Sequence, residues 1–168
     1  PHSPEAEQGV LGCCMLEPSL LGDVQQQMDP EAFYDLRHRE IYLAMLALSA
    51  AKKPAGDLIV LSQVLKDADM LEKVGGLAYL MMLPNSVPSA ASLEYYVEIA
   101  REKWQLRKLL ATCAGVMARV YAHEGNVDQL MDEVERDLNA VVQYRVMQTE
   151  AVPIAKLMRD ALAHLEDH

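Results

Sequence analysis

The stretch from residue 90 to about residue 122 keeps one helical pattern without a break, and it constrains the fold more than any other part of the chain. Apolar side chains recur there at spacings of four and three residues, which is the heptad pattern of a helix that packs lengthwise against another helix. At 1.5 Å per residue, such a helix is roughly 50 Å long. This first stripe consists of Leu106, Leu110, Cys113, Met117 and Val120.

A second stripe follows the four-residue turn HEGN. Asn126, with Gln129 three residues later, resembles a capping box and marks the start of another helix. Two heptad stripes joined by a short turn predict an antiparallel helical hairpin. Because a lone hairpin has little core, we expect both stripes to contribute to pairing with another copy. The second stripe consists of Met131, Val134, Leu138 and Val141.

The part of the chain before the hairpin carries shorter helical patterns separated by turn residues. Ser3, Pro4 and Glu5 provide the hydroxyl cap, the first-turn proline and the first-turn carboxylate of a helix start. No stretch alternates with period two, so we expect no strand. The fold class predicted is all-α. Its expected parts are a compact helical globule at 1–89, a long antiparallel helical hairpin at 90–145, and a linker with a separate linker helix at 146–168.

The segment PIAKLMRDALAHLEDH, residues 153–168, begins with a proline that suits the first turn of a helix. The residues just before it have no clear period and are expected to form the linker. The segment has an apolar stripe, yet no later helical pattern follows to cover it, so we expect the chain to be a fragment of a longer protein. The stripe consists of Ile154, Leu157, Met158, Ala161, Leu162 and Leu165.

Charge and cysteine content exclude several classes of function. The formal net charge of -10 at pH 7 argues against binding nucleic acid through bulk electrostatics. Three cysteines without a ladder of spacings fit a reduced, cytoplasmic protein. No run approaches the roughly 18 apolar residues that span a bilayer, so we expect no membrane association.

No pattern of a catalytic, cofactor or metal site is found. None of the eight glycines is followed by lysine, as a P-loop requires. His38 and Glu40 are two residues apart and would point to different sides of a helix, so we interpret them as an exposed helix face. Cys13 and Cys14 fit the buried side of a helix better than a redox pair.

Trp104 lies in the most basic part of the chain, with four cations close to it in sequence. Such a cluster can stack nucleic-acid bases. The acidic total favours a packing or interface role instead, and we expect little direct DNA binding. The four cations are Arg101, Lys103, Arg107 and Lys108.

Five segments, taken in order, resemble the amino-terminal domain of the DnaB-type replicative DNA helicases of bacteria. The hairpin and the linker helix also follow in the family's order, and the resemblance covers residues 3 to about 145. The segments are EAEQGVLG at 5–12, PEAFYDLRHREIYLAM at 30–45, GDLIVL at 56–61, VGGLAYLMML at 74–83 and VPSAASLEYYVEIAREKWQLRKL at 87–109.

The resemblance implies an assembly. Two copies would pair through their hairpins, and three pairs would form a collar on a hexameric ring. The linker helix of one subunit would dock on its neighbour's RecA-like ATPase domain, which is absent from this sequence. ATP and Mg would belong to that missing domain, so no cofactor, metal or catalytic residue is expected in this chain.

The resemblance also implies partners. Primase would bind the collar, and helicase loaders would contact the hairpin, linker and ATPase surfaces. Leu110 also belongs to the first stripe, so intramolecular packing is an alternative role for it. The family's primase contacts would fall on Glu5, Tyr79, Leu110 and Val116.

The main hypothesis is a non-catalytic oligomerisation and partner-docking domain of a replicative helicase. The alternative is a free-standing helical adaptor or loader-like protein that grips a separate helicase with its terminal helix. The sequence after His168 distinguishes them, because a downstream P-loop in the same reading frame would eliminate the adaptor. An enzyme acting through histidines or cysteines has no supporting constellation.

Overall fold

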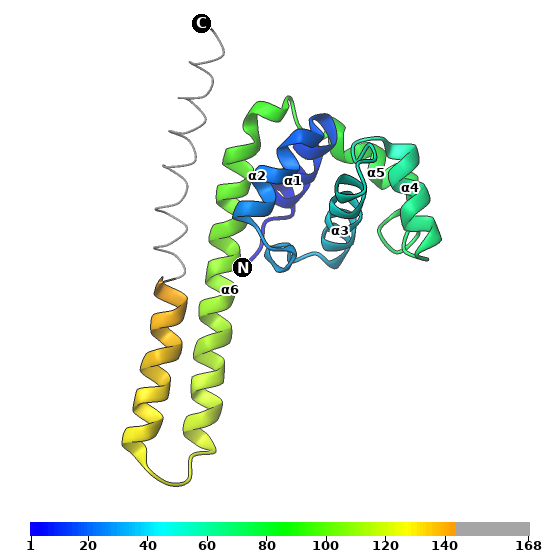
Figure 1. Ribbon diagram of the computed structural model, residues 1–168. Coiled ribbons are helices and arrows are strands. Elements are labelled where there is room, and N and C mark those ends of the chain that lie inside the picture. Colours follow the sequence, from blue (N-terminus) through cyan, green and yellow to red (C-terminus); the bar gives the residue numbers. More distant parts are fainter. Residues whose placement is uncertain (144–168) are drawn as a thin grey trace, which may run out of the picture. The chain divides into compact units, whose positions relative to one another are not determined.

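The computed structural model describes residues 1–143 and divides the chain after Trp104. We call residues 1–104 the globular unit and the described residues from 105 onward the hairpin unit. Every regular element in this range is a helix, which confirms the all-α fold (Figure 1). The linker helix stripe at 154–165 lies outside the described residues.

The globular unit contains five complete helices and the start of a sixth. Polar side chains cap several of them: the Ser3 hydroxyl accepts from the backbone N–H of Ala6, as predicted, and Asp57 accepts from Ile59. Short 3-10 turns at Pro18–Leu20, Pro30–Ala32 and Ala90–Ser92 join them. The helices are α1 (Pro4–Leu16), α2 (Leu21–Gln27), α3 (Leu36–Ala50), α4 (Leu58–Asp67), α5 (Gly76–Asn85) and α6 (Leu93–Tyr121).

Helix α1 forms the centre of the globular unit. It approaches α5 so closely that a Cβ added at Gly12 would lie 2.4 Å from the carbonyl oxygen of Leu83. Cys13 and Cys14 are both buried, which confirms their interpretation as packing residues. Burial raises the pKa of the Cys14 thiol to about 12, so it stays protonated and unreactive at neutral pH.

The first turns of α6 also belong to this core. Their buried residues recur at spacings of four and three, as expected for one helix face. Trp104 is only 4% exposed, which confirms its interpretation as a packing residue. The buried residues of α6 are Leu93, Val97, Ala100 and Trp104.

The hairpin unit pairs the rest of α6 with an antiparallel helix over residues 127–143, shown in yellow and orange in Figure 1. The Asn126 side chain accepts from the backbone N–H groups of Asp128 and Gln129, so the predicted cap is present. Arg119 of α6 reaches Asp137 of the second helix, with 2.6 Å between nitrogen and oxygen. These contacts confirm the antiparallel hairpin.

Candidate functional site

Two regions qualify as functional sites: an exposed apolar face of the hairpin unit and a polar cluster in the globular unit. On α6, the first stripe stays largely exposed: 46% for Leu106, 57% for Leu110, 60% for Met117 and 55% for Val120. Cys113 between them is exposed as well. The first stripe therefore remains uncovered within the described chain.

The face of α6 that packs against the second helix of the hairpin differs from the face that carries the first stripe. Its half-buried residues Thr112, Val116 and Arg119 recur at spacings of four and three, and Arg119 makes the ion pair across the hairpin. An intramolecular packing role for Leu110 is therefore wrong, because the larger apolar side chains face outward. Val116, a primase candidate, lies on this half-buried face.

The second stripe is divided between the two sides of its helix. Val134, Leu138 and Val141 are half-buried, whereas Met131 is 63% exposed. Val127 and Val142, which the sequence analysis did not select, are 59% and 58% exposed. Of the second stripe, Met131 alone is exposed in the manner of the first stripe.

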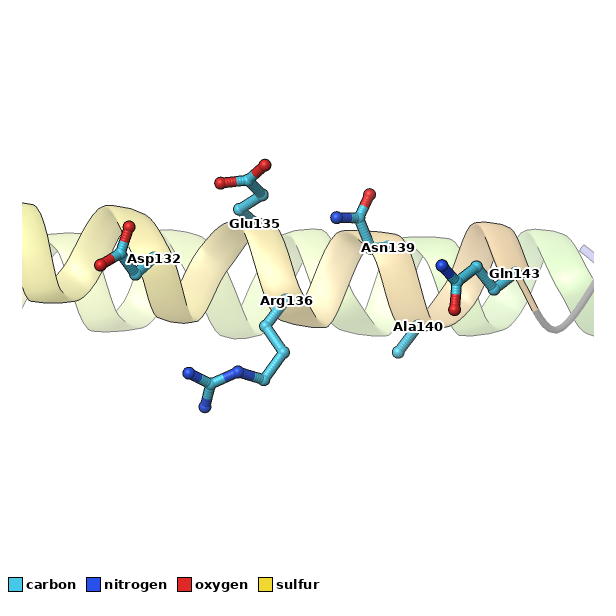
Figure 2. A pocket seen from close by; sticks show the side chains of 6 residues that line it. All are labelled: Asp132, Glu135, Arg136, Asn139, Ala140 and Gln143. Atoms are coloured by element: carbon cyan, nitrogen blue, oxygen red, sulfur yellow. The ribbon is translucent and has the colours of Figure 1, made fainter.

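Another side of the second helix is polar. Figure 2 shows side chains that project from this helix around an open hollow, most of them charged or amide-bearing. All six are exposed, and no group in the described range could hold a metal ion. The hairpin unit thus has an apolar and a polar side. The lining residues are Asp132, Glu135, Arg136, Asn139, Ala140 and Gln143.

In the globular unit, a buried polar chain links three helices. His38 of α3 places Nδ1 2.6 Å from Oε2 of Glu7 on α1, and Nε2 2.6 Å from Oη of Tyr79 on α5. His38 is 0% exposed and Glu7 2%. The interpretation of His38 as part of an exposed face is therefore wrong.

Glu7 has further partners. Its two carboxylate oxygens accept the backbone N–H groups of Tyr34, at 2.7 Å, and Asp35, at 3.3 Å. These bonds fix the turn that leads into α3. With both ring nitrogens of His38 also hydrogen-bonded, the Glu7–His38–Tyr79 chain ties α1, α3 and α5 together.

A cation lies over the tyrosine. The guanidinium of Arg37 is 4.8 Å from the centroid of the Tyr79 ring, within the range of a cation–π contact. Asp35 holds the same guanidinium at 2.7 Å. The hydrogen bond from Arg37 keeps the pKa of Asp35 below its usual value, and the carboxylate raises the pKa of Arg37.

The predicted primase candidates lie in both units. Glu5 is exposed on the first turn of α1, and Tyr79 is half-buried on α5. Gln8, one turn after Glu5, donates to the Tyr79 hydroxyl at 3.3 Å. Tyr79 therefore lies beside the start of α1, whereas Leu110 and Val116 belong to the hairpin unit.

The signal for the polar chain was present in the helix spacings. Glu7 precedes Val10 and Leu11 by three and four residues, and His38 precedes Ile41 and Tyr42 in the same way. Both polar residues thus fall on the apolar face of their helices, where a polar side chain needs a buried partner.

Residues 1–102 match the family of the DnaB-like helicase N terminal domain. The chain belongs to this family. The replicative DNA helicase DnaC of Bacillus subtilis is 41% identical over 85% of this chain and 31% of its own length. The DnaB helicase of Haemophilus influenzae is 34% identical over 100% of this chain and 37% of its own length. The chain thus spans about a third of the length of these relatives.

Solved structures agree on the fold. The N-terminal domain of DnaB helicase from Mycobacterium tuberculosis matches with a TM-score of 0.76 and 32% identity, covering 83% of this chain and 98% of that one. A DnaB-like replicative helicase, whose interactions with primase were studied, matches with a TM-score of 0.68 and 24% identity, covering 83% and 31%. Along residues 1–143, no helix is long and apolar enough to cross a bilayer.

Proposed function

We propose that this DnaB-family domain is a non-catalytic oligomerisation and partner-docking region of a replicative DNA helicase. The observation that carries the proposal is the exposed first stripe on α6. Because the relatives are about three times as long, we place ATP, Mg and DNA unwinding in a RecA-like ATPase domain outside this sequence.

Self-association is the part of the function with the strongest physical support. A single exposed Leu or Met is ordinary on a protein surface, but a heptad row of them is typical of an interface. Burying each such side chain fully would contribute about 1.5–3 kcal/mol, and a two-fold pairing uses every position twice. We therefore propose a dimer through the first stripe and Met131, with three dimers in a hexameric ring.

Light scattering of the chain over a range of concentrations tests this proposal. The expected result is a molar mass that rises from the monomer toward a dimer or a larger assembly. A monomer at high concentration would contradict pairing through the hairpin.

Primase is the proposed partner of the globular unit. Tyr79 is half-buried and held beside the start of α1, so the ring is ordered before any partner arrives. Glu5 is exposed on the first turn of α1 and is proposed as a second primase contact of this unit. Leu110 and Val116 are proposed as separate primase contacts on the hairpin unit. Helicase loaders are proposed to contact the hairpin and the linker region.

Titration of the cognate primase's carboxy-terminal domain tests this site. The expected result is that Tyr79→Ala binds at least about tenfold more weakly than the unchanged chain, since buried aromatic anchors often dominate interfaces. Glu31→Ala, an exposed position in the 3-10 turn before α3, is the control. Equal affinity of Tyr79→Ala and the unchanged chain would remove Tyr79 from the interface.

The segment at 153–168 is proposed to be a linker helix that docks on the ATPase domain of a neighbouring subunit. Its apolar stripe, Ile154 to Leu165, supports this role because it has the spacing of a helix face that needs a cover. Substituting Leu162 by Glu in the longer protein is expected to weaken ring assembly while the isolated domain still folds.

A further inference from the structure

The hydroxyl of Tyr79 is engaged inside the globular unit. Oη lies 2.6 Å from Nε2 of His38 and 3.3 Å from the amide nitrogen of Gln8. The amide nitrogen of Gln8 only donates, so Oη accepts from it. The remaining question is which atom carries the proton between Tyr79 and His38.

Glu7 answers it. Its two oxygens already accept backbone N–H groups from Tyr34 and Asp35, as an ionised carboxylate does, so it can only accept from His38. Nδ1 of His38 therefore carries a proton and donates to Glu7. When the ring carries this proton alone, Nε2 is an acceptor, and the Tyr79 hydroxyl donates its proton inward to Nε2.

The ring of Tyr79 is also fixed at its other end. A Cβ added to Gly75 would lie 2.7 Å from the Cβ of Tyr79, so the backbone before α5 packs directly on the base of this side chain. Arg37 lies over the ring. Tyr79 is thus held at its hydroxyl, at its base and on one face, while the residue remains half-buried.

We propose that Glu7 and His38 are positioning residues for partner recognition. They draw the Tyr79 hydroxyl inward, so that the partner meets an ordered aromatic ring with the Arg37 guanidinium and makes no hydrogen bond to the hydroxyl. This inference rests on the proposed docking of primase at Tyr79. A side chain that is ordered before binding loses less conformational entropy on binding, and affinity rises accordingly.

Two substitutions of His38 distinguish its hydrogen bond to Glu7 from its hydrogen bond to Tyr79. The amide of an asparagine side chain reaches about as far as Nδ1 of histidine, so His38→Asn can still donate to Glu7 but leaves Tyr79 without its anchor. A glutamine amide reaches about as far as Nε2, so His38→Gln can still hold the Tyr79 hydroxyl. Both variants lose one buried hydrogen bond and are expected to lose similar stability.

The test is titration of the primase carboxy-terminal domain against the full chain, with unfolding by urea measured for each variant. Tyr79→Phe and His38→Asn are each expected to bind about 3- to 10-fold more weakly, the range that corresponds to one lost hydrogen bond. His38→Gln should bind within about twofold of the unchanged chain. The control, Tyr42→Phe, loses another buried hydroxyl bond, that to the carbonyl oxygen of Met28, and should not change affinity.

The double variant, His38→Asn with Tyr79→Phe, tests whether the Tyr79 hydroxyl anchors the ring or contacts the partner. If the hydroxyl only anchors the ring, Tyr79→Phe has no further effect on affinity in the His38→Asn background. If the partner contacts the hydroxyl, the two losses multiply, and the inference is overturned. Affinities that follow stability across all variants, Tyr42→Phe included, would also overturn it.

The outcomes separate this inference from the docking proposal. Weak binding by Tyr79→Ala together with full affinity of Tyr79→Phe and His38→Asn would leave the docking site intact and refute the positioning role. Full affinity of Tyr79→Ala would refute both. A partner-free measurement adds a further check: nitrogen NMR of His38 should show a proton on Nδ1 and none on Nε2, and a protonated Nε2 would contradict the inward hydroxyl.

Discussion

In the globular unit the polar residues Glu7 and His38 are 2% and 0% exposed, whereas in the hairpin unit Leu110 and Met117 are 57% and 60% exposed. The globular unit places polar groups inside because each finds a partner there. The hairpin unit leaves apolar groups outside because its two helices offer too little surface to cover them. The proposed assembly would cover the exposed apolar row of the hairpin unit, whereas the buried polar groups of the globular unit are satisfied within one copy.

The largest loss of stability is expected from a substitution in the buried Glu7–His38–Tyr79 chain. Glu7→Leu removes the acceptor of the buried His38 and of the partly buried backbone N–H groups of Tyr34 and Asp35. We expect the free energy of unfolding to fall by about 3–5 kcal/mol, measured by urea denaturation, because each buried donor left without an acceptor costs about 1–3 kcal/mol. Glu5→Leu, on the same helical turn but exposed, is the control and should cost less than about 1 kcal/mol. Equal losses would contradict a buried role for Glu7.

Two glycine substitutions compare a closely packed position in the globular unit with an open position in the hairpin unit. Gly12→Ala would place a methyl group 2.4 Å from the backbone oxygen of Leu83, and should destabilise the protein by about 1–3 kcal/mol. Gly115→Ala on α6 meets nothing within 4 Å, and should stabilise the helix by about 0.5–1 kcal/mol. Thermal unfolding of the two variants should therefore shift in opposite directions. A destabilising Gly115→Ala would mean that this side of α6 is already covered.

The smallest effect concerns the exposed pair of Arg37 and Asp35. Because the pKa of Asp35 is lower in the folded chain than in the unfolded one, the pair stabilises the fold above the usual pKa of an aspartate, and this contribution is lost as pH falls through the folded value. Both groups are partly exposed, so we expect less than about 1 kcal/mol. Asp35→Asn should therefore show a weaker acid dependence of stability below about pH 4 than the unchanged chain. An unchanged acid dependence would contradict the pair.

Local patterns were sufficient to predict much of this structure. The hydroxyl of Ser3, the side chain of Asn126 and the heptad spacing are short-range signals, and the helices they predict are present. The family could also be identified from segments such as VGGLAYLMML. These features depend on neighbours within a few residues of one another.

Features that depend on distant residues were not predicted. Glu7, His38 and Tyr79 are separated by 31 and 41 positions, and no spacing rule pairs them. A heptad stripe indicates a face that needs a cover, but it does not indicate which helix covers it. The hairpin accordingly closes on Val116 and Arg119, and the more apolar first stripe faces outward.

The most direct test is the molar mass of the chain and two charge variants, measured by light scattering across a hundredfold range of concentration. Met117→Glu places a carboxylate in the first stripe, whereas Ala140→Glu places the same charge on the polar side of the hairpin unit. The prediction is that the unchanged chain and Ala140→Glu associate and that Met117→Glu remains a monomer. Equal association of all three, or a monomer throughout, would contradict assembly through the first stripe.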